Sequence, residues 1–160
     1  MENKSIDNLA GETALLVCKG EDCHGKLDID HLENLTTKAL GVLQEQGVYA
    51  MMVFLFSRSG NETLDNYLKE VKKNGEKIAA IELVEGLVNS LREDPIKSLN
   101  VQFEEVLNGN LNKKKKRLLQ HFLNKISGDL EKLLFVKEFY EQTLIYVRHI
   151  AKGMKNESSK

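Results

Sequence analysis

The sequence predicts an all-α fold, and three observations support this prediction. Apolar residues recur at three- and four-residue steps along almost the whole chain, which is the spacing of one helix face. The only apolar run that could form a buried strand has no second strand candidate to pair with. Short segments with glycine, asparagine or serine separate the periodic stretches. We therefore expect a compact single-domain bundle of six to eight helices at 1–155, followed by a frayed tail at 156–160.

The first two helices are predicted from apolar residues that share one face. Those of the first are Ile6, Leu9, Ala10, Ala14 and Val17. A loop is expected at 19–28, which has mixed charge and two glycines. Asp28 or Asp30 can then cap the second helix, because a short acidic side chain satisfies free N–H groups. The apolar face of that helix comprises Leu32, Leu35, Ala39 and Leu43.

A third helix is predicted around 48–58, after Gly47. Its first nine residues, 48–56, are all apolar and include an alanine and two methionines, which favour a helix over a strand. A helix that is apolar on all sides is a buried one. We therefore expect this segment to be the buried central helix of the domain.

Further helices follow at similar spacing. One around 64–71 is expected to end at Asn74–Gly75 with a left-handed cap. The next, at 78–91, stops before Pro95, because the residue preceding proline is disfavoured in a helix. A short helix at 99–107, one at 118–126 closed by Ser127–Gly128, and a long last helix from Leu130 to Met154 complete the chain.

Composition excludes several classes of protein. The chain has 160 residues and a net charge of -1, and no segment approaches the ~20 apolar residues of a membrane-spanning helix. Its start lacks the basic residues and the long apolar core of a signal peptide. Two cysteines cannot form a secreted disulfide framework. These features indicate a cytoplasmic protein with free thiols.

Two patterns could carry chemistry, and both are weak. Cys18, Cys23, His24 and His31 form the only cluster of soft ligands, but zinc sites usually use tight pairs two to four residues apart. We expect reduced thiols and surface histidines there, with no bound metal and no cofactor. The acidic pairs Glu82/Glu85 and Glu104/Glu105 are expected on solvated faces. No nucleotide-binding, metalloprotease or serine-hydrolase motif occurs, so we expect no enzymatic activity.

The charge distribution carries more information than the total. Residues 111–128 contain six lysines and arginines and no acid, so the rest of the chain carries -7. Cations at a helix start oppose the helix dipole. Lys115 falls within the apolar arc of this helix, so either it snorkels or the regular helix begins only near Arg117. A basic patch neutralises phosphates without reading bases, which favours a polyanion contact. The residues expected to make it are Lys113, Lys114, Lys116 and Arg117.

Two segments resemble a known family. Residues 46–58, QGVYAMMVFLFSR, are similar to the central helix of the small all-helical subunit of the type III-B CRISPR (Cmr) RNA-guided effector complex. That helix reads as a polar residue, a glycine, a long apolar run with Phe-Leu, and a basic residue, matched here by Gly47, Phe54–Leu55 and Arg58. The last helix is also similar. Its acidic, aromatic and basic positions are matched by Glu138, Tyr146 and the segment 148–152, RHIAK.

The resemblance implies a non-catalytic subunit in antiviral defence. Members of this family stack head to tail along the complex, and touch other subunits and single-stranded target RNA or guide RNA through basic surfaces. Arg58 and Arg148 match the basic positions of the family, and Lys152 and Lys155 continue the surface of the last helix. The patch at 113–117 rests on charge alone.

Three alternatives remain at this stage. A small metal-dependent enzyme or sensor would use Cys18, Cys23, His24 and His31. The small subunit of the related type III-A complex is also helical and ends with a comparable aromatic-rich helix. A helical protein–protein adaptor without a nucleic-acid role would instead use the lysine patch to bind an acidic partner.

Overall fold

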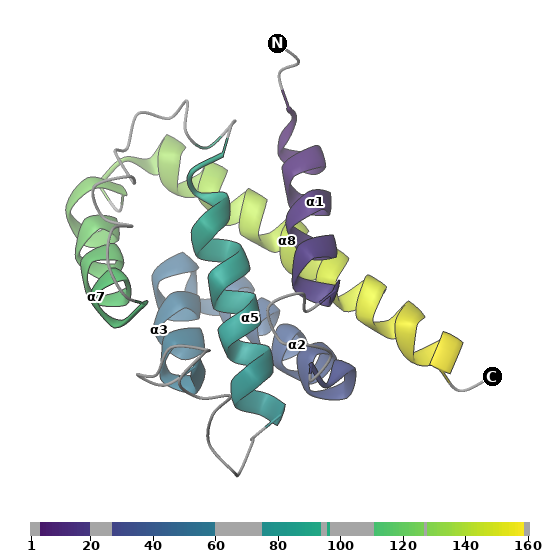
Figure 1. The fold of residues 1–160 in the computed structure, drawn as a ribbon. Coiled ribbons are helices and arrows are strands. Elements are labelled where there is room, and N and C mark those ends of the chain that lie inside the picture. The colour runs from purple at the N-terminus through teal and green to yellow at the C-terminus, as the bar shows by residue number, and fades with distance from the viewer. Residues whose placement is uncertain are drawn as a thin grey trace.

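The computed structural model describes residues 4–19, 27–59, 75–93, 96, 111–126 and 128–158. These residues form six α-helices and one π-helical turn, and no strand occurs among them (Figure 1). The all-α prediction is therefore confirmed. The elements are α1 (Ile6–Lys19), α2 (Ile29–Gln46), α3 (Val48–Ser59), α5 (Gly75–Ser90), α7 (Leu111–His121), η3 (Phe122–Ile126) and α8 (Leu130–Ser158).

Most predicted helices in the described ranges are present, but several of their bounds differ. Gly75, expected to cap a preceding helix, is instead the first residue of α5. The helix α8 continues to Ser158, so the first part of the tail expected to fray is helical. The predicted helices at 64–71 and 99–107 and most of the predicted loop at 19–28 lie outside the described residues.

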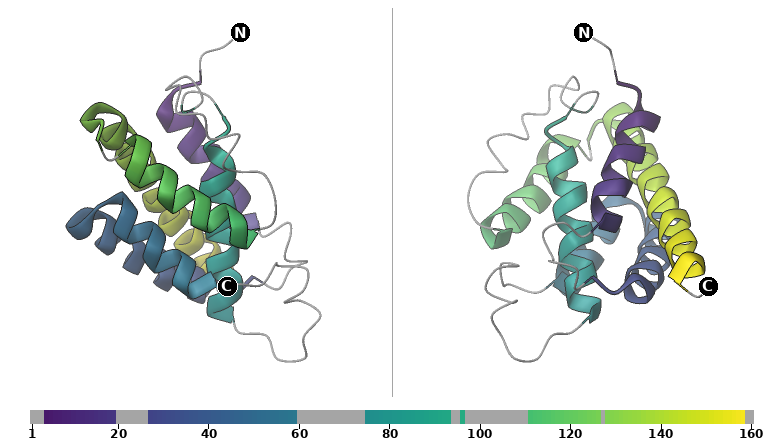
Figure 2. Two further views of the ribbon diagram at one scale, coloured as in Figure 1. Left: turned by 90° about the vertical axis from the view of Figure 1, so that its left-hand side faces the viewer. Right: turned by 45° about the vertical axis from the view of Figure 1, so that its right-hand side comes forward.

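The long helix α8 forms one side of the described structure, and α1, α2 and α3 pack against it and against α5. α1 and α2 both lie along α8, while α5 contacts α1, α2 and α3. α7 packs beside α3, on the opposite side of α5 from α1 (Figures 1 and 2). The molecule therefore has an α7 side and an α1 side, separated by α5.

Local signals fix both ends of α2. The carboxylate of Asp28 accepts hydrogen bonds from the backbone N–H groups of Asp30 and His31, at 2.9 and 3.2 Å, so Asp28 is the predicted cap. At the other end Gly47 has φ of 95°, a conformation that side chains disfavour. Its N–H bonds to Leu43, and its carbonyl accepts from Met51 in α3. One glycine thus ends α2 and begins α3.

The core is centred on the middle of α8. Phe139 and Tyr140 are fully buried, with ring centroids 5.5 Å apart. The Tyr140 hydroxyl donates to the Leu87 carbonyl of α5 at 3.2 Å, so the polar end of this large side chain is satisfied inside the core. Burial raises the pKa of Tyr140 and keeps it neutral. This bond helps fix α8 against α5.

The expectation that the helix at 48–58 is buried on all sides is wrong for its outer face. Met51, Met52 and Leu55 of α3 are buried, but Tyr49 and Val53 are 38% and 42% exposed. The described neighbours of α3, chiefly α2 and α5, cover only one side of it. The apolar run therefore specifies a helix, while the packing around it decides which residues are buried.

Among the described helices, none is long and apolar enough to cross a membrane.

Candidate nucleic-acid interface

The basic segment folds as helix α7, which begins at Leu111. Lys116 and Arg117 are exposed, and Leu118 directly after them is fully buried. The helix therefore turns its apolar side inward and presents at least these two cations to solvent. The backbone of 111–115 is helical, so the alternative of a helix that starts only near Arg117 is wrong. The side chains of Lys113, Lys114 and Lys115 lie outside the described part of the structure.

The second half of this segment differs from the predicted regular helix, because residues 122–126 form the π-helical turn η3. Leu118 and Ile126 are both fully buried. In a regular α-helix, eight residues would place these side chains about 80° apart around the axis. The wider π turn is under-wound, which reduces that angle and brings both onto the buried side. The turn thus keeps the basic face of α7 outward while its apolar side remains packed.

Arg58, at the end of α3, is held by two neighbours. Its guanidinium lies 3.0 Å from the Glu76 carboxylate in the first turn of α5, and it stacks over the Phe54 ring at 5.3 Å. The Arg58 side chain is 46% exposed. Arg58 therefore links two helix ends, and a phosphate could reach it only on its outer side.

Arg148 and Lys152 lie one helical turn apart on α8, and both are exposed. Neither makes an ion pair within the described ranges. Tyr146, the aromatic residue of the same segment, donates its hydroxyl hydrogen bond to the Asp7 carboxylate of α1. This bond raises the pKa of Tyr146 and helps fix α1 against α8. The segment that carries the family resemblance thus combines a structural contact with two exposed cations.

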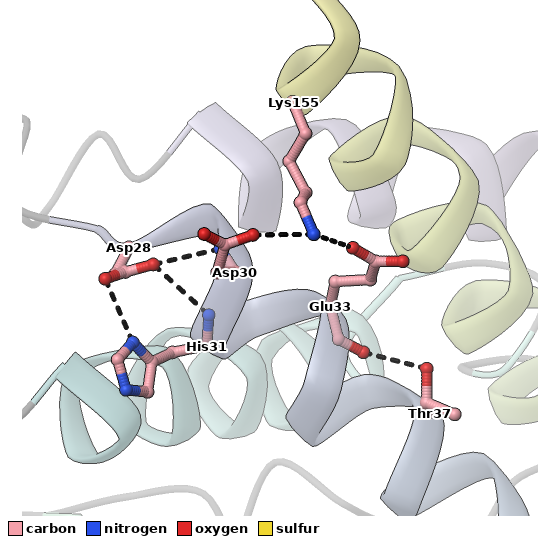
Figure 3. Close-up of polar contacts among 6 residues, drawn as sticks. All are labelled: Asp28, Asp30, His31, Glu33, Thr37 and Lys155. Carbon is pink, nitrogen blue, oxygen red and sulfur yellow. Dashed lines mark hydrogen bonds and ion pairs between the residues drawn. The ribbon is translucent and has the colours of Figure 1, made fainter. Parts of the chain in front are cut away.

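Lys155 has a different environment from the other predicted site residues. Its ammonium lies 2.6 Å from an Asp30 carboxylate oxygen and 2.7 Å from one of Glu33, as Figure 3 shows. The hydrogen bond to Asp30, and then that to Glu33, raise the pKa of Lys155. The side chain therefore fastens the end of α8 to the first turn of α2.

The predicted soft-ligand cluster is not assembled in the described residues. Cys18 is buried, its thiol lies 3.6 Å from the Val147 carbonyl of α8, and burial raises the pKa of this thiol to about 12. His31 lies with Nδ1 2.9 Å from the Asp28 carboxylate (Figure 3). Cys23 and His24 lie outside the described residues. Across the described ranges, no three histidine, cysteine or acidic residues are placed to hold a metal ion.

The expectation that Glu82 lies on a solvated face is wrong. Glu82 is only 5% exposed, because it lies on the side of α5 that faces α1. Its partner Glu85 is half-buried, and both glutamates line a groove between α1 and α5. Glu104 and Glu105 lie outside the described residues. Sequence reasoning missed this acidic groove, because the groove depends on how α1 and α5 pack together.

The structure separates the predicted contact residues into different surfaces. Lys116 and Arg117 lie on α7, which packs beside α3, the helix that carries Arg58. Arg148 and Lys152 lie toward the C-terminal end of α8, at the opposite side of the molecule from α7 (Figures 1 and 2). Lys155 faces carboxylates of α2. One basic surface is therefore centred on α7, and a smaller one lies on α8.

Comparisons with protein-family models, with curated proteins and with solved structures find no match for this chain.

Proposed function

We propose that this protein is a non-catalytic small subunit of a type III-B CRISPR (Cmr) ribonucleoprotein complex and binds RNA phosphates through the basic surface of α7. One observation carries the RNA contact: the segment 111–128 has six cations and no acid, and its part Leu111–His121 folds as α7, on which Lys116 and Arg117 are exposed. The assignment to the Cmr complex rests on the resemblance of residues 46–58 and of the last helix. Its other subunits and its guide and target RNA are the proposed partners.

The chemistry of α7 favours a contact that does not read sequence. Lysine and arginine neutralise phosphates by releasing counterions, and this interaction is independent of the bases. Proteins that bind single-stranded RNA tightly by themselves usually add aromatic residues on which bases stack. No aromatic residue lies among the cations at 113–117. We therefore infer weak binding by one copy and stronger binding where several copies are held along one RNA.

The proposed contact set follows from the basic segment of the sequence and, for the cations whose side chains are described, from their surroundings. Lys113, Lys114, Lys116 and Arg117 form the main surface, and Arg58 on the adjoining helix extends it. Arg148 and Lys152 are proposed as a second contact. Lys155 is left out, because Asp30 and Glu33 already neutralise it.

Charge reversal on α7 tests the proposal. Replacing Lys113, Lys114, Lys116 and Arg117 with glutamate should weaken binding of a mixed-sequence single-stranded RNA by at least about tenfold at low salt. The logarithmic salt slope should fall by about 0.7 for each phosphate that the variant no longer neutralises. Acidic residues are favourable in a first helical turn, so circular dichroism should show an unchanged helix content.

A matched pair of variants controls for net charge. Lys116→Glu with Arg117→Glu removes two cations from α7, while Lys38→Glu with Lys137→Glu makes the same change in charge elsewhere. RNA affinity should fall in the first pair and stay close to wild type in the second. Equal losses would show a dependence on total charge alone, and no loss in either would remove α7 from the interface.

A helical adaptor remains the second candidate, because the α1 side of the molecule has a groove with exposed leucine. It predicts weak RNA binding that changes little with salt, together with a defined protein complex.

A further inference from the structure

A groove of 350 Å³ lies between α1 and α5. Figure 1 shows that α1 and α7 lie on opposite sides of α5. Leu9, Leu16 and Val17 of α1 give it an apolar wall. The helices are in close contact at one point of this wall, because Gly86 of α5 has no side chain. A Cβ added to Gly86 would come within 2.4 Å of the Val17 side chain. The groove is therefore built into the packing of two core helices.

The groove carries one large exposed apolar side chain, Leu16 of α1. Leu16 is 57% exposed, and its neighbour Leu15, about 100° away around the helix, is 49% exposed. Leu15 lines a second, shallower hollow between α1 and α8. Leu15 and Leu16 thus form a short apolar ridge across α1, with a hollow on either side. Such a ridge is suited to burial against another chain.

Acidic side chains surround this apolar wall. The described lining residues of the groove include four glutamates and one lysine: Glu12, Glu82, Glu85, Glu93 and Lys4. Lys4, the only cation among the described lining residues, forms an ion pair with Glu12 at 2.9 Å. The groove lining is thus net negative, while α7 on the far side of α5 is strongly positive. This polarity repels a polyanion from the groove and attracts a cation.

We propose that the groove between α1 and α5 is a docking site for a basic amphipathic segment of a partner protein. An apolar side chain of that segment packs on the exposed Leu16, and its lysines or arginines reach Glu85 and Glu93. An amphipathic helix in a groove between two helices uses this geometry, with apolar anchors at three- and four-residue spacing. The acids of the groove select a positively charged partner and set its orientation, and the apolar contact with Leu16 supplies most of the affinity.

This site does not depend on the RNA contact proposed above. It uses α1 and α5, whereas the main RNA contact uses α7 on the other side of α5, and among the described residues none of the cations proposed to bind RNA lines the groove (Figures 1 and 2). A variant in one surface should leave binding at the other unchanged.

A pair of synthetic peptides tests the proposal with the full-length protein. The probe is a fluorescently labelled helical peptide about four turns long, with leucines on one face and lysines beside them. The comparison peptide keeps the leucines and replaces every lysine with glutamate. By anisotropy at about 0.15 M salt, the lysine peptide should bind at least about tenfold more tightly than the glutamate peptide. Equal binding of the two would overturn the proposal.

Substitutions inside and outside the groove show where the lysine peptide binds. Leu16→Ala, and separately Glu85→Gln with Glu93→Gln, should each weaken the lysine peptide by at least about fivefold. The matched controls are Leu134→Ala, at a leucine that is 53% exposed on α8, and Glu138→Gln with Glu157→Gln at exposed acids of α8. The controls should change affinity by less than about twofold. Similar losses in controls and groove variants, or no loss in the groove variants, would overturn the proposal.

Two further readouts separate other occupants. Sedimentation that shows a wild-type dimer and a monomeric Leu16→Ala variant would mean that a second copy covers the ridge, and would overturn the proposal. RNA affinity should be the same in wild type and in Leu16→Ala, which supports two independent surfaces. A large loss of RNA affinity in Leu16→Ala would contradict this assignment of the groove.

Discussion

Two basic parts of the chain, the start of α7 and the end of α8, use the same residue types in different ways. In α8, Lys155 contacts two carboxylates of α2, one of them on a residue 122 positions earlier. In α7, Lys116 and Arg117 are exposed, and the helix packs mainly on α3 and η3. The role of a cation is thus set by the carboxylates that the fold brings to it. Such a difference is invisible in local sequence.

The largest expected effect is on the free energy of unfolding, and it compares a buried side chain of α8 with one of α7. Phe139 of α8 and Leu118 of α7 are both fully buried. Phe139→Ala should lower the free energy of unfolding by about 3–5 kcal/mol, because it opens a cavity beside Tyr140 in the centre of the core. Leu118→Ala removes a smaller side chain at the edge and should cost about 2–3 kcal/mol. Urea unfolding of both variants measures these two losses. A larger loss for Leu118→Ala than for Phe139→Ala would contradict the view that α8 is more central to the core than α7.

Much of the fold follows from periodicity, and the reasons for the misses are physical. The apolar spacing predicted the helices at 6–19 and 29–46 and the start of the helix at 130 closely, because each helix has one continuous buried face. It missed that the last helix continues to Ser158, beyond its apolar positions. It overestimated the burial of α3, because the number of neighbours around a helix is not encoded in its own apolar run. The sequence wrongly predicted that Glu82 lies in solvent, because it does not show how α1 and α5 cross. It is this crossing that buries Glu82.

The candidate site could be predicted only in part. The excess of cations at 111–128 was evident from the sequence, and Lys116 and Arg117 are indeed exposed. That Lys155 is paired depends on α8 lying along α2. The Asp28 cap was one of two predicted candidates, since capping is local and depends on a few neighbouring residues.

The next effect concerns the α2 turn to which Lys155 is attached. Asp28→Ala should destabilise the protein by about 1 kcal/mol, because it removes the acceptor for two N–H groups at the start of α2. Asp28→Asn keeps a good capping side chain and should cost less. Thermal unfolding of both variants at neutral pH tests this. Equal losses would mean that charge rather than capping matters.

The same residue gives a pH dependence. The hydrogen bond from His31 is the main cause that lowers the pKa of Asp28. The stabilisation by this carboxylate is therefore present above its unfolded-state pKa of about 3.9, and is lost as pH falls through its lower folded-state pKa. The difference in stability between wild type and Asp28→Ala should shrink below about pH 4. A difference that grows on acidification would contradict this.

Two buried threonines on the facing helices α2 and α8 give a smaller contrast. Thr143 donates to the Phe139 carbonyl at 2.8 Å, whereas the Thr36 hydroxyl has no partner among the described residues. Thr143→Val should lower the free energy of unfolding by about 1 kcal/mol, and Thr36→Val should raise it by about 0.5–1 kcal/mol. Chemical denaturation of each variant shows whether its free energy of unfolding rises or falls. A loss of stability in Thr36→Val would mean that its hydroxyl is satisfied.

The smallest expected effect separates the two kinds of cation directly. Lys155→Met should lower the melting temperature and change RNA affinity by less than about twofold. Lys116→Met should leave the melting temperature unchanged and weaken RNA binding by about two- to threefold at low salt. Differential scanning fluorimetry and RNA anisotropy on the same samples test this. If both substitutions weakened RNA binding equally, the proposed difference in role between Lys155 and Lys116 would be wrong.

The most direct test of the proposed function is a tagged pull-down from the native host, with protein identification and RNA sequencing on the same eluate. It is carried out for the wild type and for the variant with glutamate at 113, 114, 116 and 117. We predict a multi-subunit complex with repeat-derived guide RNA for the wild type, and less RNA for the variant. A single protein partner without RNA would contradict the account, and α7 would then be a docking surface for that protein.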